Sequence, residues 1–276
     1  MIAEYDARLW YDQIPLRRSV RAYDSRKVPD DTLDRLRPFL SGFSGLCRGA
    51  RGVLLDDAGD VFTGIIASLG RITGVSTVAV FIGDTSVPEH MESVGYLGEG
   101  VILQATSLGL GTCWVAGTFN RNCTASRVKL GKNEKVVAVT PLGFPVEKED
   151  AGHRLVRSLA NSKKRKPLEA IFGGLPPEKW PPGCREALEA ARLAPSALNR
   201  QPWFFEVTHG EITLSVQGAG SGYGSLKRLD CGIAMLHFEV AAKALGLEGH
   251  WELLKPPHVA RFILHESGSG ISQARG

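Results

Sequence analysis

The sequence predicts an α+β protein in which two repeated halves pack as an intramolecular pseudo-dimer. Leu108-Gly109-Leu110-Gly111-Thr112-Cys113-Trp114 aligns with Leu245-Gly246-Leu247-Glu248-Gly249-His250-Trp251, at an offset of 137 residues (246 minus 109). The segments before both copies align without a gap, so that Gly95 meets Gly232 and Ala105 meets Ala242. Chance is the alternative, since many helices end in Gly-Leu, but the matched helix, helix end and tryptophan favour a duplication. Two such halves can pack around a pseudo-twofold axis, as two subunits do.

Composition excludes several classes of protein. The chain has 276 residues, 43% hydrophobic and 22% charged, which is ordinary for a globular protein. Its net charge of +4 is too small to indicate nucleic acid as the main partner. We expect no membrane association, because no apolar run approaches the roughly 20 residues of a membrane helix and the start lacks the apolar core of a secretory signal. The five cysteines show no metal-binding spacing, so we expect unpaired thiols and a cytoplasmic protein.

The first half alternates helical and extended patterns. Residues 31–40 predict a short helix capped by an aspartate. Residues 75–82 are β-branched and apolar, which predicts a buried strand. Residues 97–108 carry a helical apolar stripe that ends at a glycine. Residues 136–139 predict a second buried strand, closed by the Pro-Leu-Gly-Phe-Pro turn at 141–145.

The second half repeats this alternation in a shorter form. A helix is expected at 186–193, ended by the following proline. Residues 203–208 and 211–216 flank His-Gly and predict a hairpin. A second helix is expected at 230–245 and a last strand at 261–265.

These patterns divide the chain into four parts. The first half spans residues 1–160, and a Lys-, Pro- and Gly-rich connector spans 161–183. The second half spans 184–266, and the tail at 267–276 is expected to be disordered.

Two basic segments could bind an anion. Arg17, Ser19 and Arg21 alternate, so an extended segment places all three on one face, where guanidinium groups suit a phosphate. Lys163 and Arg165 alternate in the same way. The alternative for the first segment is a solvated basic stretch; for the second, it is a solvated connector.

A third segment, Ala194-Pro195-Ser196-Ala197-Leu198-Asn199-Arg200-Gln201-Pro202-Trp203, combines rigid backbone with polar side chains. Its two prolines restrict the backbone around Ser196 and Asn199. An asparagine amide both donates and accepts hydrogen bonds, so it can match the edge of a heterocycle. The alternative is a turn that ends a helix, and Trp203 could serve in packing instead of lining a site.

Other chemistries find no support in the sequence. Gly109-Leu110-Gly111 lacks the third glycine of a dinucleotide fingerprint and follows a helix. Ser196 lacks the GxSxG elbow of hydrolases. The histidines form no HExxH pattern, so structural roles are expected for His237 and His250. Cys113 is expected to be a buried apolar residue.

Taken together, Arg-Arg-Ser-Val-Arg, Ala-Pro-Ser-Ala-Leu-Asn, Leu-Gly-Leu-Gly-Thr-Cys-Trp, the Pro-Leu-Gly-Phe-Pro turn and Lys-x-Arg-x-Pro resemble the nitroreductase family of FMN flavoproteins. The resemblance covers most of the chain and is weakest around residues 41–70. It implies a nitroreductase-like α+β fold. In the family, FMN lies between two subunits, with the Arg-Ser-Arg segment from one and the Pro-Ser-x-x-Asn segment from the other.

This chain departs from the usual pattern in a way that resembles the fused, two-repeat nitroreductase-like branch. Residues 41–47 of the first half lack the proline and asparagine, and the second half lacks an Arg-Arg-Ser-x-Arg segment. Each half therefore keeps one complementary portion. The expectation is one complete FMN site and one degenerate site per chain, so that a monomer suffices for the site although further dimerisation is possible.

The resemblance also implies site residues and an activity. The residues that would hold the phosphate and part of the ring are Arg17, Arg18, Ser19 and Arg21, and those that would complete the phosphate clamp are Lys163 and Arg165. The residues that would approach the ring from the other half are Pro195, Ser196, Ala197, Asn199 and Gln201. The flavin's reactive edge would lie at Ala116 and Gly117, and its pyrimidine end at Arg71. No metal site and no side chain acting directly in catalysis are implied.

The implied activity is hydride transfer from NADH or NADPH, through the flavin, to a nitroaromatic, quinone or similar small acceptor. Three alternatives stay open. The chain could be a flavin-dependent dehalogenase or flavin-fragmenting enzyme of the same superfamily, a non-catalytic FMN-binding protein for storage or sensing, or a scaffold that has lost flavin.

Overall fold

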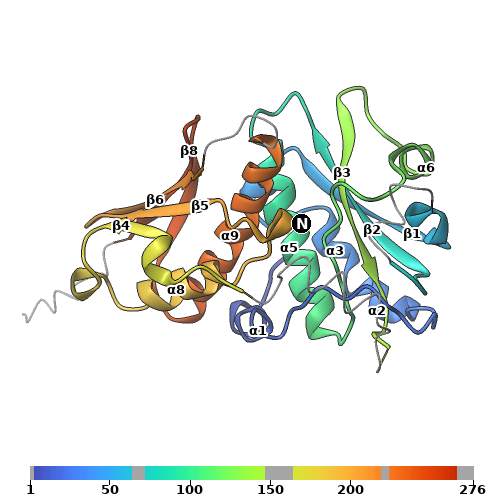
Figure 1. Cartoon of the computed structure of the whole chain (residues 1–276), viewed down its shortest axis with the longest axis horizontal. Coiled ribbons are helices and arrows are strands. Elements are labelled where there is room, and N and C mark those ends of the chain that lie inside the picture. The colour runs from blue at the N-terminus through green and yellow to red at the C-terminus, as the bar shows by residue number, and fades with distance from the viewer. Residues whose placement is uncertain (1–2, 64–71, 147–163, 219–223, 266–276) are drawn as a thin grey trace, which may run out of the picture.

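Two long helices lie side by side in the middle of the molecule, between two β-sheets (Figure 1). The computed structural model describes residues 3–63, 72–146, 164–218 and 224–265. The central helices are α5 (His90–Ser107) from the first half and α9 (Gly224–Ala244) from the second. One hydrophobic core runs through them and joins residues of both halves, which places the two halves in a single packed unit.

The first sheet is antiparallel and has three strands. They are β1 (Ala50–Asp56), β2 (Thr77–Asp84) and β3 (Glu134–Leu142), in the order β1-β2-β3. The central strand β2 is buried at every position but its last, because both of its faces are covered. Helix α5 packs on one face, and a second apolar cluster that includes Val20 and Phe62 covers the other.

The second sheet has five strands. They are β4 (Phe172–Gly174), β5 (Trp203–Val207), β6 (Glu211–Val216), β7 (Gly249–Leu253) and β8 (His258–Leu264), in the order β4-β5-β6-β8-β7. Strand β4 pairs in parallel with β5, and the other neighbours are antiparallel. The sequence segment expected as a connector thus supplies an edge strand of this sheet. Helix α8 (Cys184–Arg192) packs against α9.

Shorter elements complete the described part of the chain. Helix α1 is Ala7–Gln13, α2 is Asp30–Asp34, α3 is Arg37–Leu40 and α6 is Arg121–Ser126. The 3₁₀ turns are η1 (Gly45–Cys47), η2 (Ala58–Phe62), η3 (Leu168–Ala170), η4 (Pro177–Lys179) and η5 (Ala197–Asn199).

The contact between α5 and α9 confirms the pseudo-dimer. A Cβ added to Gly95 would lie 2.1 Å from the carbonyl oxygen of Leu229, and one added to Gly232 would lie 2.1 Å from that of Glu92. Both pairs are related by the offset of 137 found in the sequence, since 95 corresponds to 232 and 92 to 229. The same backbone contact is therefore made twice with the roles of the halves exchanged, as at an isologous dimer interface.

Several predicted boundaries differ from the structure. The helix expected at 31–40 is broken into α2 and α3, because Pro38 lacks the N–H that a continuous helix would bond to Asp34. Helix α5 begins at His90, earlier than the predicted 97. Strand β3 continues through Pro141 to Leu142, so the strand does not end at 139 as predicted.

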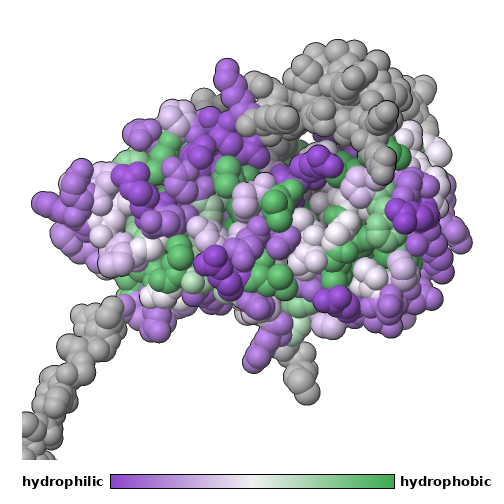
Figure 2. Space-filling model, turned by 90° about the horizontal axis from the view of Figure 1, so that it is seen from below, coloured by the Kyte–Doolittle hydropathy of each residue, from purple (hydrophilic) through white to green (hydrophobic). Residues whose placement is uncertain are grey.

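The surface and the cysteines agree with the compositional expectations. On the face shown in Figure 2, hydrophobic residues lie in separate small patches between hydrophilic ones. All five cysteines are unpaired. Within the described ranges, no helix is both long and apolar enough to cross a bilayer.

Candidate functional site

The segment from Ser196 to Gln201 has an unusual backbone. Ser196 is extended, with φ −149° and ψ 159°, and the 3₁₀ turn η5 follows it. Leu198, Asn199 and Gln201 all have positive φ, at 52°, 53° and 50°. Left-handed conformations cost on the order of 1 kcal/mol or more for residues other than glycine. Three of them within four residues require surrounding contacts that fix the segment.

Contacts with the second half supply part of this support. The Ser196 hydroxyl accepts a hydrogen bond from the backbone N–H of Gln201 at 2.8 Å. The backbone N–H of Ala197 donates to both carboxylate oxygens of Asp230 on α9, at 3.1 and 3.2 Å. Burial raises the pKa of Asp230 to about 7. Trp203 is fully buried in β5, which bears out its packing role.

The basic segment at 164–166 lies directly on this turn. The amide nitrogen of Asn199 donates to the carbonyl of Lys164 at 2.7 Å, and Arg165 donates to the amide oxygen of Asn199 at 3.2 Å. Gln201 accepts from the backbone N–H of Lys166 at 2.8 Å. The side chains of Asn199 and Gln201 therefore hold the basic segment in place.

Arg165 bonds to the second half and is electrostatically coupled to Arg17 of the first. Its guanidinium donates to the carbonyl of Leu193 through Nε at 3.3 Å and Nη2 at 3.0 Å. The pKa of Arg165 is lowered to about 10, by burial and then by repulsion from Arg17 and Arg192. The repulsion links Arg17 of the N-terminal segment electrostatically to Arg165, which is bound to Asn199.

Arg17 itself is buried and incompletely satisfied. Its side chain is 5% exposed, and its Nε lies 3.6 Å from Oε1 of Glu99 on α5. Its Nε and Nη1 are buried and have no hydrogen-bond acceptor among the described residues. Buried donors of a charged group are costly when unpaired, so this guanidinium is suited to an anionic group supplied by a ligand.

The Glu99 carboxylate that faces Arg17 belongs to a buried polar network. Glu99 accepts from Nε1 of Trp114 at 2.6 Å and contacts Nε2 of His237 at 2.9 Å. Nδ1 of His237 lies 3.0 Å from the carbonyl of Ala190, which can only accept, so Nδ1 carries a hydrogen. This network links α5 to α9 and gives His237 the structural role expected of it.

Four other predicted residues are Arg18, Ser19, Arg21 and Pro195. Ser19 forms a parallel bridge with Thr112, the residue after the first Gly-Leu-Gly. Arg18 is exposed and Arg21 is half-buried, and neither side chain bonds to a described residue. Pro195 is half-buried at the start of the turn.

Ala116 and Gly117 follow the first repeat. The carbonyl of Ala116 accepts from Nη2 of Arg121 at 2.5 Å, and Gly117 is exposed with open space at its Cβ position. The predicted residues Arg71 and Lys163 lie outside the described residues.

Of the four residues Glu99, His237, Asp230 and Arg192, only His237 was singled out from the sequence, and for it only a structural role was expected. Glu99 and His237 are fully buried, and Asp230 is 4% exposed. A charged or polar residue within a long apolar helix is the signal that could have identified the first three. Arg192 ends α8, and only the fold brings it near Arg165.

Two described cavities, of about 510 and 170 Å³, lie elsewhere in the fold. Neither is lined by a predicted flavin-binding residue. The larger cavity is therefore distinct from the predicted flavin-binding residues.

Comparison with known proteins identifies the family. The sequence model of the family described as "Putative TM nitroreductase" matches residues 10–242. The chain belongs to this nitroreductase family. No curated protein matches the sequence.

Solved structures agree with this at the level of the fold. A nitroreductase-like protein of Thermotoga maritima MSB8 is 21% identical, with a TM-score of 0.65, and the match covers 96% of this chain and 97% of that one. Because the sequence identity is only 21%, this match shows a shared fold and nothing further, and the shared fold covers 96% of this chain.

Two shorter nitroreductases match about half of this chain. One, from Bacteroides fragilis NCTC 9343 with bound FMN, is 20% identical, with a TM-score of 0.41, covering 51% of this chain and 93% of its own. An FMN-dependent nitroreductase of Clostridium difficile R20291 is 18% identical, with a TM-score of 0.42, covering 53% and 91%.

Proposed function

We propose that this nitroreductase-family protein is an FMN-dependent oxidoreductase with one FMN site per chain, built from both halves. Hydride would pass from NADH or NADPH to a nitroaromatic, a quinone or a similar small oxidised molecule. The observation that carries the proposal is the buried guanidinium of Arg17, whose Nε and Nη1 have no acceptor among the described residues. It belongs to the first half and is electrostatically coupled to Arg165, which is bound to Asn199 of the second half.

The charges around Arg17 fit an anionic cofactor. Arg17, Arg165 and Arg192 converge, and their repulsion contributes to the lowered pKa of Arg165. Arg192 is balanced by Glu189, with Nε 2.5 Å from Oε2. Glu99 faces Arg17 but is also engaged by His237 and Trp114. Net positive charge remains, and a phosphate or an anionic reduced ring would neutralise it.

A bound flavin supplies the hydride chemistry, so the protein's residues need only bind and orient. Arg17 and Arg165 would bind the anionic portion of the cofactor. Asn199 and Gln201 would act mainly by holding residues 164–166, since their amides bond to that segment. Glu99 and His237 fix the guanidinium of Arg17 at the boundary between the halves. We expect ping-pong kinetics, because donor and acceptor would use the same face of the ring in turn.

The proposed setting is the cytoplasm. All five cysteines are unpaired, which suits a reducing compartment. With one site built from both halves, a single chain would be sufficient to bind the cofactor.

The experiment is a visible absorption spectrum of the purified protein, followed by anaerobic addition of NADH and NADPH. We expect a flavin spectrum at about one FMN per chain, bleached by at least one donor. Arg17→Met should reduce the flavin content, whereas Arg8→Met, at an exposed site on α1 that pairs with Asp12, should not. A flavin that stays oxidised with both donors would support a non-catalytic FMN-binding protein. A colourless protein that FMN cannot reconstitute would refute the flavin site itself.

A further inference from the structure

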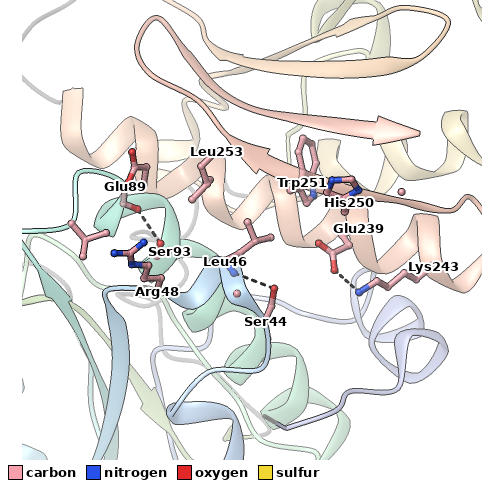
Figure 3. A pocket seen from close by; sticks show the side chains of 13 residues that line it. Ser44, Leu46, Arg48, Glu89, Ser93, Glu239, Lys243, His250, Trp251 and Leu253 are labelled. Atoms are coloured by element: carbon pink, nitrogen blue, oxygen red, sulfur yellow. Dashed lines mark hydrogen bonds and ion pairs between the residues drawn. The ribbon is translucent and has the colours of Figure 1, made fainter. Parts of the chain in front are cut away.

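The larger cavity lies between the two halves, away from the flavin segments. It has a volume of about 510 Å³ and is lined by residues of the turn η1, the start of α5, helix α9 and strand β7. Figure 3 shows side chains from all four elements around it. Small-molecule sites commonly fall between about 300 and 1,000 Å³, so the cavity is large enough for a ligand of two fused rings.

One wall of the cavity is formed by a segment that corresponds in the repeat to the Pro-Ser-x-x-Asn segment. Ser44-Gly45-Leu46-Cys47-Arg48 matches Ser196-Ala197-Leu198-Asn199-Arg200 in its serine, leucine and arginine. Both serines are extended, with φ/ψ of −157°/157° and −149°/159°, and each precedes a single 3₁₀ turn. The turn η1 is therefore the structural counterpart of η5.

The other walls are also repeat counterparts of the flavin region. Gly249, which lines the cavity, lies 137 residues after Thr112, which bridges to Ser19. Ser93 of α5 also lines the cavity and lies 137 residues before Asp230, which supports η5. The cavity is thus the pseudo-twofold mate of the candidate flavin site, with the contributions of the halves exchanged.

The chemistry of this second site differs from that of the first. Cys47 stands where the flavin side has Asn199, and it is a buried thiol whose pKa burial raises to about 11. The thiol provides no amide, and it lies between Leu46 and Arg48 in sequence and is not among the residues that line the cavity. The second site therefore lacks the amide that holds the basic segment on the other side.

Charged groups lie at both ends of the cavity, with Leu46 and Leu253 between them, and Glu89 lies at the same end as Arg48 (Figure 3). At one end, Arg48 is exposed and makes no hydrogen bond or ion pair with a described residue. At the other end, Lys243 donates to Glu239 at 2.6 Å, and Tyr5 donates to the same carboxylate at 2.9 Å. One end offers the Arg48 guanidinium, which pairs with no described residue, and the other offers the Glu239–Lys243 pair, which can both donate and accept.

We propose that this cavity binds an aromatic carboxylate that carries a hydroxyl group at its far end. The carboxylate would pair with Arg48, the ring would pack on Leu46, Leu253 and Trp251, and the hydroxyl would bond to the Glu239–Lys243 pair. An aromatic ring of this kind matches the apolar middle, and each polar end of the ligand finds a partner. The site is separate from the proposed flavin site and does not depend on it.

The test is calorimetric titration of the flavin-containing protein with 6-hydroxy-2-naphthoate. We expect one binding site per chain. Arg48→Met should weaken binding about tenfold or more, because a charge-assisted contact is lost. Arg200→Met removes the exposed arginine at the repeat-equivalent position and should leave binding unchanged. 2-Naphthol, which lacks the carboxylate, should bind the unmodified protein about as weakly as 6-hydroxy-2-naphthoate binds the Arg48 variant.

A second variant blocks the cavity without touching its charges. Gly45 lines the cavity, has no atom within 4 Å of an added Cβ and does not have a positive φ, so Gly45→Phe is compatible with folding. It should abolish binding of the naphthoate while the far-ultraviolet spectrum and flavin content stay unchanged.

Three results would overturn the proposal. The first is binding to the unmodified protein weaker than about 1 mM, which is negligible recognition. The second is binding that Arg48→Met and Gly45→Phe leave intact. The third is a flavin content of two per chain that Gly45→Phe lowers to one, since the cavity would then be a second flavin site. Failure of the proposed oxidoreductase function is distinguishable, because protein without flavin would still bind the naphthoate.

Discussion

The two glycines at the centre of the α5–α9 contact give the most direct test of the pseudo-dimer. In Gly95→Ala the new methyl group would lie 2.1 Å from the carbonyl oxygen of Leu229, although ordinary van der Waals contact begins at 3.4 Å. Gly232→Ala places a methyl group at the same distance from the carbonyl of Glu92. Backbone carbonyls of a helix cannot rotate away, so the helices must separate.

The expected magnitude follows from two opposing effects. Alanine favours a helix over glycine by about 1 kcal/mol. Overpacking of a core contact costs about 1–3 kcal/mol, and a rigid backbone partner favours the upper part of that range. We therefore expect each substitution to lower the free energy of unfolding by about 1–2 kcal/mol. Because either one already separates the helices, the double variant should lose less than the sum of the two.

Urea unfolding followed by circular dichroism measures these differences. Gly59→Ala is the matched control, because an added Cβ there meets no atom within 4 Å. Its effect should stay within about 0.5 kcal/mol. If Gly95→Ala or Gly232→Ala stabilised the protein by the helix-propensity gain alone, the close approach of the helices would be wrong. Strict additivity in the double variant would refute the symmetric contact.

Three further substitutions test the site. Asn199→Ala should weaken FMN binding about tenfold, because it releases Lys164; unchanged affinity in a fluorescence titration would contradict the shared site. Glu99→Gln should lower the unfolding free energy by about 3 kcal/mol, because buried Arg17 loses its carboxylate; a neutral effect in urea would show that the pair carries no stability. Burial raises the pKa of Asp230 to about 7, whereas an unfolded carboxyl titrates near 4. The folded state then binds more protons between these values, so stability should fall as pH rises from about 4 to about 7. Asp230→Asn should flatten that fall, and urea midpoints across the window that keep the slope would contradict the assignment.

The buried elements of the fold could be predicted from the sequence, and the edges of its sheets could not. Strand β2 is central and covered on both faces, so it carries a continuous apolar run. Strands β1 and β7 lie at sheet edges and are mostly half-buried. Edge strands need no such run, and the sequences Ala-Arg-Gly-Val-Leu-Leu-Asp and Gly-His-Trp-Glu-Leu carry no strong strand signal.

The site shows a similar division. The basic and Pro-Ser-x-x-Asn segments were recognisable because their chemistry is concentrated in a few consecutive residues. Their partners Glu99, His237 and Asp230 were not, because they lie alone in the helices α5 and α9. Which segment each of them faces depends on how the helices pack, and the local sequence does not contain that information. The interpretation of Asn199 also changed, since its amide bonds to Lys164 and Arg165 in this structure.

Fusion of two halves into one chain has a physical consequence for the two sites. In a homodimer every substitution appears in both sites, so they cannot differ in chemistry. Here Cys47 and Asn199 occupy equivalent positions in a single chain, and each can change without the other. The α5–α9 contact has no such freedom, because each helix needs a glycine where the partner's backbone approaches. Packing therefore keeps Gly95 and Gly232 matched, while the repeat-equivalent residues on either side of them, such as Cys47 and Asn199, differ.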